Sequence, residues 1–158
     1  MRDLTHAGKS GEVRMVDVGE KPETLRVATA KGAIVMRAET LAAIRQNRIA
    51  KGEVLATARI AGILAAKRTS ELIPLCHALQ LTDVSVDFSL DDALPGVRVD
   101  TRASTVGRTG VEMEALTAAA VALLTVYDMA KGIDREMRIV DVELVAKSGG
   151  QSGDWTRT

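Results

Sequence analysis

Two stretches decide the fold: VSVDFSL at residues 84–90 and VRVDTR at residues 97–102. In both stretches every second side chain is apolar, which is typical of a strand with one buried face. Residues 91–96 between them contain aspartates, a proline and a glycine, and this composition predicts a turn. The two strands therefore form an antiparallel hairpin.

The segments on either side of the hairpin complete a repeating order of elements. In chain order they are a strand at 25–36, helices at 39–47 and 53–70, then, after the hairpin, a helix at 111–131 and a strand at 139–147. The order strand, helix, strand, strand, helix, strand predicts an α+β fold of the ferredoxin-like kind, a four-stranded antiparallel sheet with helices on one face. Gly32 marks a bulge or bend in the first strand. Thr109 and Glu112 have the spacing of a capping box at the start of the last helix.

The composition fits one globular domain over residues 1–158, with an N-terminal arm at 1–24 and a flexible Gly-rich tail at 148–158. Hydrophobic residues make up 46% of the chain and charged residues 27%, which excludes a disordered chain. The formal net charge is zero, so no overall field attracts nucleic acid. An RNA-binding sheet of the same element order needs aromatic side chains on its central strands, and the only phenylalanine is Phe88.

The cysteine content and the N-terminus predict a cytoplasmic protein. A single cysteine, Cys76, excludes an internal disulfide and fits a reducing compartment. Residues 1–14 are polar and charged and contain no apolar signal core. No uncharged apolar run is long enough to span a bilayer, so we expect no membrane contact.

The two long predicted helices are apolar on nearly every side. Residues 115–126 are apolar apart from threonines, and residues 54–66 are interrupted mainly by Arg59. One sheet covers only one side of a helix, so such helices need a second cover, which other subunits can supply. The small side chains, Gly62 among them, allow close helix packing. The alternative is an Ala-rich sequence selected for helix propensity alone.

Asp128 is a candidate for acid/base chemistry because it lies in the last turn of its helix, where the helix dipole disfavours a carboxylate. Lys131 lies three residues further on the same helix face, within ion-pair reach. A carboxylate beside an ammonium group can exchange protons with a substrate. The alternative is an ordinary surface ion pair, which contributes little energy.

Other titratable residues have both a functional and a structural interpretation. His77 follows a helix-ending turn, and a loop histidine carries protons well near neutral pH. Cys76 and His77 are adjacent and His6 is the only other histidine, so zinc-type ligand spacing is absent and no metal site is expected. Glu112 and Glu114 suit the positive end of a helix dipole, and Glu112 is the expected capping-box partner, which favours a structural role.

Basic residues stand mostly at the ends of the predicted elements. They are Lys21, Arg26, Lys51, Lys67, Arg68, Arg108, Lys131 and Lys147. They either pair with helix dipoles, as Lys67 and Arg68 can, or bind an anionic, phosphorylated substrate. Residues 147–150 lack the Gly-Lys-Ser/Thr order of a P-loop, no helix follows them, and the chain has no GxGxxG dinucleotide fingerprint.

Eight short stretches, spread in order over nearly the whole chain, carry a family resemblance. They are MVDV (15–18), KGEV (51–54), ATARIAG (56–62), AAKRT (65–69), LIPLCH (72–77), TGVEMEALT (109–117), YDM (127–129) and AKSGG (146–150). Each stretch alone is modest, but the full series is highly specific. It resembles the molybdenum cofactor biosynthesis protein C family (MoaC).

The resemblance implies a reaction that needs no metal or redox cofactor. The substrate would be (8S)-3',8-cyclo-7,8-dihydroguanosine 5'-triphosphate, and the products cyclic pyranopterin monophosphate and pyrophosphate. Asp128 would be the general acid/base, with Lys131 beside it and Lys51 as a further catalytic lysine. The purine-derived base and the sugar would contact Leu75, Cys76, His77, Met113 and Glu114, and Glu112 would be either a further substrate contact or a structural cap. The triphosphate and the pyrophosphate leaving group would contact Lys21, Arg26, Lys67, Arg68 and Lys147.

The resemblance also implies a homo-oligomer, a hexamer built as a trimer of dimers with sites at the dimer interface. Helix geometry gives the same expectation independently, because Glu114 and Asp128 are separated by about 21 Å along one helix at ~1.5 Å per residue. A small substrate cannot have its reacting atoms near both, so a neighbouring chain must contribute. The remaining alternative is a non-catalytic ferredoxin-like module that senses a small molecule, which would not need the misplaced Asp128.

Overall fold

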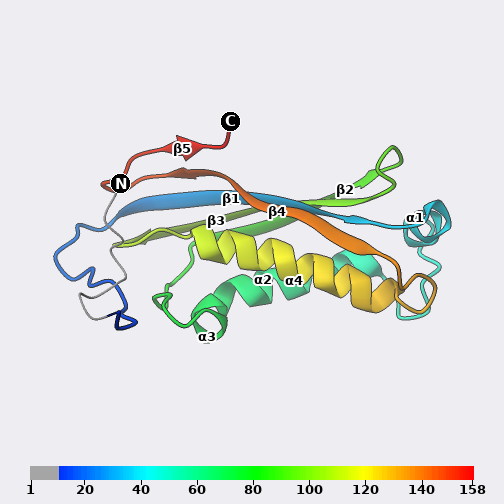
Figure 1. The fold of residues 1–158 in the computed structure, drawn as a ribbon, viewed down its shortest axis with the longest axis horizontal. Coiled ribbons are helices and arrows are strands. Elements are labelled where there is room, and N and C mark those ends of the chain that lie inside the picture. Colours follow the sequence, from blue (N-terminus) through cyan, green and yellow to red (C-terminus); the bar gives the residue numbers. More distant parts are fainter. Residues whose placement is uncertain (1–10) are drawn as a thin grey trace.

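The predicted hairpin is present in the computed structural model of the chain, which describes residues 11–158 (Figure 1). Strand β2 (Asp83–Asp91) pairs antiparallel with β3 (Gly96–Gly107), so that Phe88 lies opposite Val99. Val99 is fully buried, whereas its neighbour Arg98 is exposed, as the alternating pattern predicts. Both strands are longer than the alternation alone indicated.

The sheet is antiparallel and open, with the strand order β2-β3-β1-β4-β5. Strand β1 (Thr24–Val35) lies at its centre, between β3 and β4 (Arg138–Ser148). The predicted α+β class and antiparallel sheet are confirmed, but the predicted number of four strands is wrong. A fifth strand, β5 (Trp155–Thr156), pairs with the end of β4. Two residues are too few to show an alternating pattern, so the sequence could not indicate this strand.

The irregularity predicted at Gly32 is present. The pairing of β1 with β4 shifts register between Thr29 and Ala30 and again between Lys31 and Ala33. A Cβ atom at position 32 would lie only 2.9 Å from a methyl group of Leu123, so the glycine lets a helix approach the strand closely.

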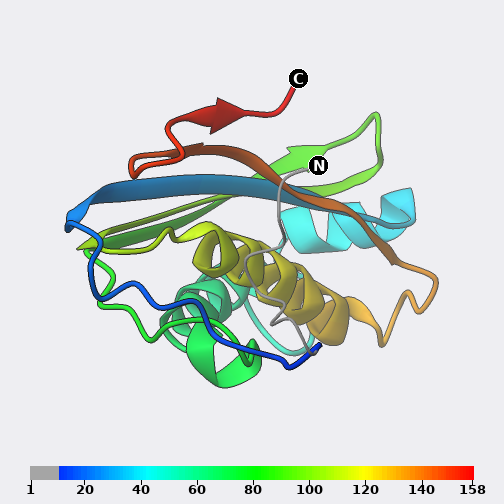
Figure 2. The same ribbon diagram turned by 60° about the vertical axis from the view of Figure 1, so that its left-hand side comes forward.

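Within residues 11–158 the fold has four helices: α1 (Ala38–Arg45), α2 (Val54–Lys67), α3 (Thr69–Leu72) and α4 (Glu112–Ala130). Figures 1 and 2 show α2 and α4 side by side against one face of the sheet. The helix predicted at 53–70 is interrupted after Lys67, where the backbone of Arg68 leaves helical geometry (φ −114°, ψ 16°). A new turn begins at Thr69, whose buried hydroxyl donates to the carbonyl oxygen of Ala66 (3.0 Å).

The predicted capping box at the start of α4 is wrong. The N-cap residue is Val111, and no side chain caps the helix there. The Glu112 carboxylate instead turns back over Gly110, where a Cβ atom would collide with it, and its Oε1 lies 4.0 Å from Nζ of Lys147. The Glu112 side chain therefore points away from the start of the helix, toward Lys147, and does not cap the helix.

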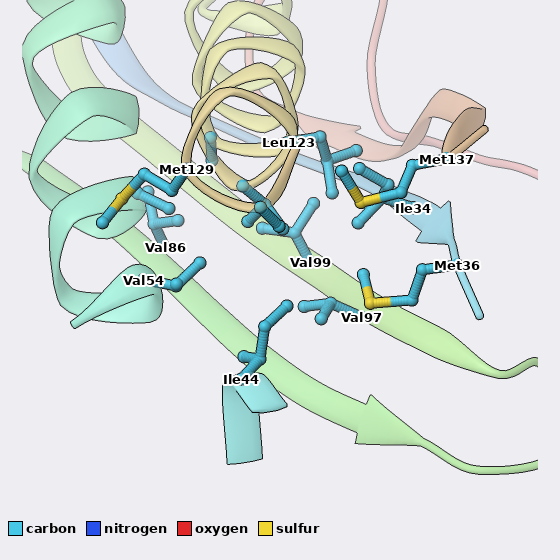
Figure 3. Packing of buried hydrophobic residues seen from close by; sticks show 14 of the residues in the cluster. Ile34, Met36, Ile44, Val54, Val86, Val97, Val99, Leu123, Met129 and Met137 are labelled. Carbon is cyan, nitrogen blue, oxygen red and sulfur yellow. The ribbon is translucent and has the colours of Figure 1, made fainter. Parts of the chain in front are cut away.

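The core lies between the sheet and the two long helices and consists of aliphatic side chains and methionines (Figure 3). Ile34 and Val97 from the sheet and Leu123 and Val126 from α4 are completely buried in it. Helix α4 is long and apolar enough to cross a membrane by length and composition. The helix is packed against the sheet and α2, so its apolar composition is that of a core helix.

Close packing of α2 against α4 depends on Gly62, and Gly62→Ala is expected to destabilise the protein. A Cβ atom there would lie 2.9 Å from the Ala118 carbonyl oxygen and 3.2 Å from a Val86 methyl group. Overpacking of this kind costs about 1–3 kcal/mol, which exceeds the roughly 1 kcal/mol that alanine gains in helix propensity. Urea unfolding measures the change. Gly132→Ala is the matched control, because nothing lies within 4 Å of its Cβ position; equal stabilities for the two variants would contradict the packing account.

Candidate active site

A pocket of about 270 Å³ lies at the N-terminal end of α4. The turn after α3 supplies Leu75, Cys76 and His77, and the first turn of α4 supplies Glu112, Met113 and Glu114. The chain before β1 closes another side with Val16, Val18 and Lys21. The pocket therefore joins three segments far apart in sequence, and it brings together the five residues predicted to contact the base and sugar with Glu112.

A second pocket of about 300 Å³ adjoins the first and shares four lining residues with it, Lys21, Thr109, Gly110 and Glu112. Its lining is dominated by cations and small polar groups. The cations are Lys21, Arg26, Arg108 and Lys147, the polar residues Ser148, Gln151 and Ser152, and the loop also contributes Gly149. Among the lining residues within 11–158, Glu112 is the single carboxylate. This composition suits the phosphate groups of a substrate.

Two glycines shape the second pocket around Arg26. Gly149 and Gly150 have φ values of +89° and +81°, a region that L side chains rarely adopt. A Cβ atom on Gly150 would overlap the Arg26 guanidinium, so the loop after β4 lies directly on that side chain. Arg26 is only 8% exposed, and its Nε donates to the Gly107 carbonyl oxygen (3.3 Å). The guanidinium is thus held rigidly at the pocket wall.

Glu114 is the buried carboxyl of the first pocket, with only 4% of its surface exposed. The pKa of this carboxyl is raised to about 7, chiefly by burial and to a smaller extent by the neighbouring Glu112 carboxylate, against the opposing effect of a backbone N–H. The pKa of the nearby Cys76 thiol is also raised, first by burial and then by Glu114. Near neutral pH the Glu114 carboxyl can therefore either donate or accept a proton.

The raised pKa of Glu114 predicts a pH-dependent stability difference for Glu114→Gln. Between the usual value of 4.5 and about 7, the folded protein keeps a proton that the unfolded chain has released. The free energy of unfolding of the wild type therefore falls as pH rises through this window, whereas the glutamine variant lacks this loss. The variant should gain about 3 kcal/mol relative to wild type between pH 4 and pH 8. Urea unfolding at a single protein concentration checks this, and a difference that does not change with pH would contradict it.

A separate cluster of charges lies at the opposite end of α4. The Asp128 carboxylate contacts Nζ of Lys131 at 2.6 Å and Nζ of Lys51 at 2.7 Å. Lys51 also donates to the Asp128 carbonyl oxygen (3.0 Å). The structure thus brings together the three predicted catalytic residues, although Lys51 is 77 positions from Asp128 in sequence.

The two ammonium groups set the charge state of Asp128. The hydrogen bond from Lys131, followed by that from Lys51, lowers the pKa of the carboxyl to about 2. The side chains of all three residues are about half exposed, at 50% for each lysine and 54% for Asp128. Asp128 is therefore an accessible, ionised carboxylate with a protonated amine on either side, and a substrate can reach all three groups.

The other predicted residues, and pocket residues that were not predicted, lie either at the pockets or away from them. Lys67 ends α2 and Arg68 follows it; both are exposed, and they line neither of the two pockets. Among the second pocket's cations, Arg108 was noted in the sequence only as one of the basic residues. Its Nη1 donates to the Gly19 carbonyl oxygen (2.9 Å), which ties the chain before β1 to the site. The pocket wall at Ser152 carried no sequence signal of function, whereas Val16 lies in the MVDV stretch of the family resemblance.

Comparison with known proteins points to one family. A family model described as the MoaC family matches residues 15–150. The chain is 58% identical to the cyclic pyranopterin monophosphate synthase of Thermomicrobium roseum, over 99% of this chain and 95% of that protein. It is 60% identical to the protein of the same name from Roseiflexus sp., over 98% of both chains. The identity to the Brucella ovis protein of that name is 59%, over 96% of this chain and 92% of the relative.

Proposed function

This chain belongs to the MoaC family, and from that membership we propose that it synthesises cyclic pyranopterin monophosphate from a cyclised GTP derivative. It is a lyase of molybdenum cofactor biosynthesis and acts on a small-molecule substrate. The observation that carries this function is the near-complete coverage of relatives about 60% identical and named for the reaction. The non-catalytic sensing module considered from the sequence has no support from these relatives.

The adjoining pockets suggest how the substrate lies. The first pocket, with Cys76, His77, Met113 and Glu114, would hold the purine-derived base and the sugar. The second would hold the triphosphate on Lys21, Arg26, Lys147 and, in addition, Arg108. Shared lining residues make the two pockets continuous, as one nucleotide requires.

The cations of the second pocket can also assist the bond that breaks. When a sugar hydroxyl attacks the α-phosphate, the bond to the β-phosphate is cleaved and pyrophosphate leaves with additional negative charge. Fixed guanidinium and ammonium groups, such as those of Arg26 and Lys147, stabilise such developing charge. Arg26 needs little reorganisation for this, since it is packed beneath Gly150.

The proton transfers of the rearrangement belong to Asp128, Lys131 and Lys51. A lysine ammonium can donate a proton to a substrate atom, and the resulting amine can take one back. Asp128 lies between the two ammonium groups and holds both in place. The general acid/base function is thus shared by the three residues, with Asp128 at the centre.

The two halves of this proposed site lie too far apart in one chain. Glu114 and Asp128 are about 21 Å apart along α4, and Figure 1 shows that this helix runs along the length of the molecule, so its two ends lie far apart. Exposed apolar side chains offer a surface for a second subunit, namely Ile60 and Leu64 on α2, Leu72 on α3 and Leu124 on α4. A homo-oligomer, a hexamer built as a trimer of dimers, would complete each site with the charged cluster of one chain and the pockets of another. Lys67 and Arg68 would then reach phosphates from a neighbouring chain.

The finer classification of the fold and the compartment follow as parts of the same proposal. The four long strands are ordered β2-β3-β1-β4, with crossovers through α2 and α4. This order supports a ferredoxin-like arrangement to which β5 is an addition. One domain over residues 1–158, in the cytoplasm, is the setting we propose for the enzyme.

Direct turnover tests the function. The purified chain is incubated with the cyclised dihydroguanosine triphosphate, and pyrophosphate and pterin are followed together. Equal amounts of cyclic pyranopterin monophosphate and pyrophosphate are expected. Binding of the substrate without release of pyrophosphate would support the sensing module instead.

A further inference from the structure

The two lysines that flank Asp128 come from different loops. Lys51 lies in segment 46–53, which joins α1 to α2, and Lys131 lies in segment 131–137, which joins α4 to β4. Both side chains are half exposed, so burial does not fix them. Their positions relative to Asp128 therefore depend on how the two loops are held.

Asp134 is a buried carboxylate in the second of these loops, with 2% of its surface exposed. Its Oδ2 accepts hydrogen bonds from the backbone N–H of Arg37 (2.9 Å) and the hydroxyl of Thr40 (3.2 Å). Its Oδ1 accepts the backbone N–H of Glu136 (3.1 Å) and lies 3.5 Å from Nε of Arg37. Both oxygens thus have partners. Oδ2 is bound by the start of α1, and Oδ1 is bound by its own loop and by the Arg37 side chain.

These bonds join the α4–β4 loop to the start of α1. Arg37 is the N-cap residue of α1 and makes no side-chain cap of its own, so the Asp134 carboxylate supplies the cap from outside. The Arg37 guanidinium in turn donates to the Ile133 carbonyl oxygen. The Tyr127 hydroxyl donates to the Arg135 carbonyl oxygen (3.0 Å), which ties the same loop to the helix turn that carries Asp128.

We propose that Asp134 is a positioning residue for the cluster of Lys51, Asp128 and Lys131. It links the loop that begins at Lys131 to helix α1, whose other end leads into the loop of Lys51. With this link in place, the two ammonium groups lie within 2.7 Å of the Asp128 carboxylate. The proposal rests on the proposed function only in so far as that cluster is catalytic.

A carboxylate is needed at this position because four donors converge on it. An asparagine side chain has one acceptor oxygen, and its NH2 group is itself a donor, so it would face the other donors without forming a hydrogen bond. Asp134→Asn therefore leaves either the α1 donors or the Glu136 N–H without an acceptor, whichever way the amide is placed. The loop must shift to relieve this, and Lys131 shifts with it.

The test compares Asp134→Asn with Asp91→Asn, a matched control. Asp91 also accepts two backbone N–H groups, from Ala93 (2.9 Å) and Leu94 (3.0 Å), and an arginine, Arg98 (2.7 Å). It is the last residue of β2, beside the β2–β3 turn, and lies outside the charged cluster and both pockets. Both variants should lose some stability, so stability alone does not distinguish a positioning role from a structural one.

Two other readouts do distinguish them. In Asp134→Asn, kcat with the cyclised triphosphate should fall by about 10- to 100-fold with KM little changed, as expected for misplaced reacting groups. The pKa of Asp128, followed by carboxyl ¹³C NMR, should rise from about 2 toward its usual 3.8 as the lysines move away. Asp91→Asn should change neither quantity.

An unchanged Asp128 pKa in folded Asp134→Asn would overturn the proposal, whatever happens to kcat. A raised pKa with unchanged kcat would support the positioning role and contradict the catalytic role of the cluster, so the two failures are distinguishable. If Asp134→Asn does not fold, Thr40→Val removes one donor and keeps the side-chain volume. It should then shift the Asp128 pKa in the same direction by a smaller amount, and no shift would overturn the proposal.

Discussion

Asp128→Asn is expected to lower kcat by about 10²–10⁴-fold, the usual contribution of a positioned acid/base group. The amide has nearly the same size and the site is half exposed, so a lysine that loses its acceptor can turn to water, and the fold and substrate binding should persist. What is lost is the negative charge that holds two ammonium groups at 2.6 and 2.7 Å. Single-turnover kinetics, with substrate binding measured separately, give the comparison.

Asp92→Asn serves as the control for this substitution. Asp92 is also an exposed carboxylate in an ion pair, with Arg45 at 2.7 Å, but it lies in the β2–β3 turn outside both pockets. Its replacement should leave kcat unchanged. Near-normal turnover by Asp128→Asn would remove Asp128 from the mechanism and leave its ion pairs as surface contacts.

Lys147→Ala is expected to weaken binding of the triphosphate substrate by about 10- to 100-fold, the range for losing a hydrogen bond to a charged group. Lys147 lines the second pocket, and its Nζ donates to the Ser152 hydroxyl and lies 4.0 Å from Glu112. If this ammonium group binds phosphate, an unphosphorylated analogue should bind the variant and the wild type equally. Calorimetry with both ligands separates the two contributions.

The control for the phosphate prediction is Lys31→Ala. Lys31 pairs with Glu143 at 3.1 Å between two adjacent strands and lines neither of the two pockets. Removing its charge should leave both affinities unchanged. Equal losses for the phosphorylated and unphosphorylated ligands in Lys147→Ala would mean that Lys147 maintains the pocket's shape and does not recognise phosphate.

Periodicity in the sequence predicted the long elements because each has one face against the core. The alternation in 84–90 and 97–102 became β2 and β3, and the apolar run at 111–131 became α4. The fifth strand escaped prediction because residues 155–156 are held by pairing with β4 and not by burial of a side-chain face. The break after Lys67 escaped prediction because it lies at the backbone of Arg68, and no proline or glycine marks it in the sequence.

Candidate site residues could be predicted from the sequence where the family resemblance named them. Residues that join the site only through tertiary contacts could not be predicted. Spacing on α4 indicated the Asp128–Lys131 pair, but the contact with Lys51 required the family resemblance. The capping-box interpretation of Glu112 failed because a nearby cation, Lys147, and a glycine at position 110 let the carboxylate turn toward the pockets. Arg108 and the loop at 151–152 join the second pocket only through the fold of the loop after β4.

The central claim is that one catalytic site is assembled from two chains, with the charged cluster from one and the pockets from the other. Complementation tests it most directly. Asp128→Asn and Lys147→Ala chains are mixed in equal amounts and allowed to exchange subunits, which native mass spectrometry confirms. Activity is measured at a substrate concentration well below the wild-type Kd, where Lys147→Ala alone also has about a tenth of wild-type activity or less. In a mixed dimer one site receives both substitutions and the other receives neither.

Because random exchange makes half of the dimers mixed, about a quarter of all sites should be intact, and activity should recover to about a quarter of the wild-type value. Each variant taken through the same exchange alone should recover nothing. No recovery after confirmed mixing, or full activity of an isolated monomer, would contradict a site shared between subunits.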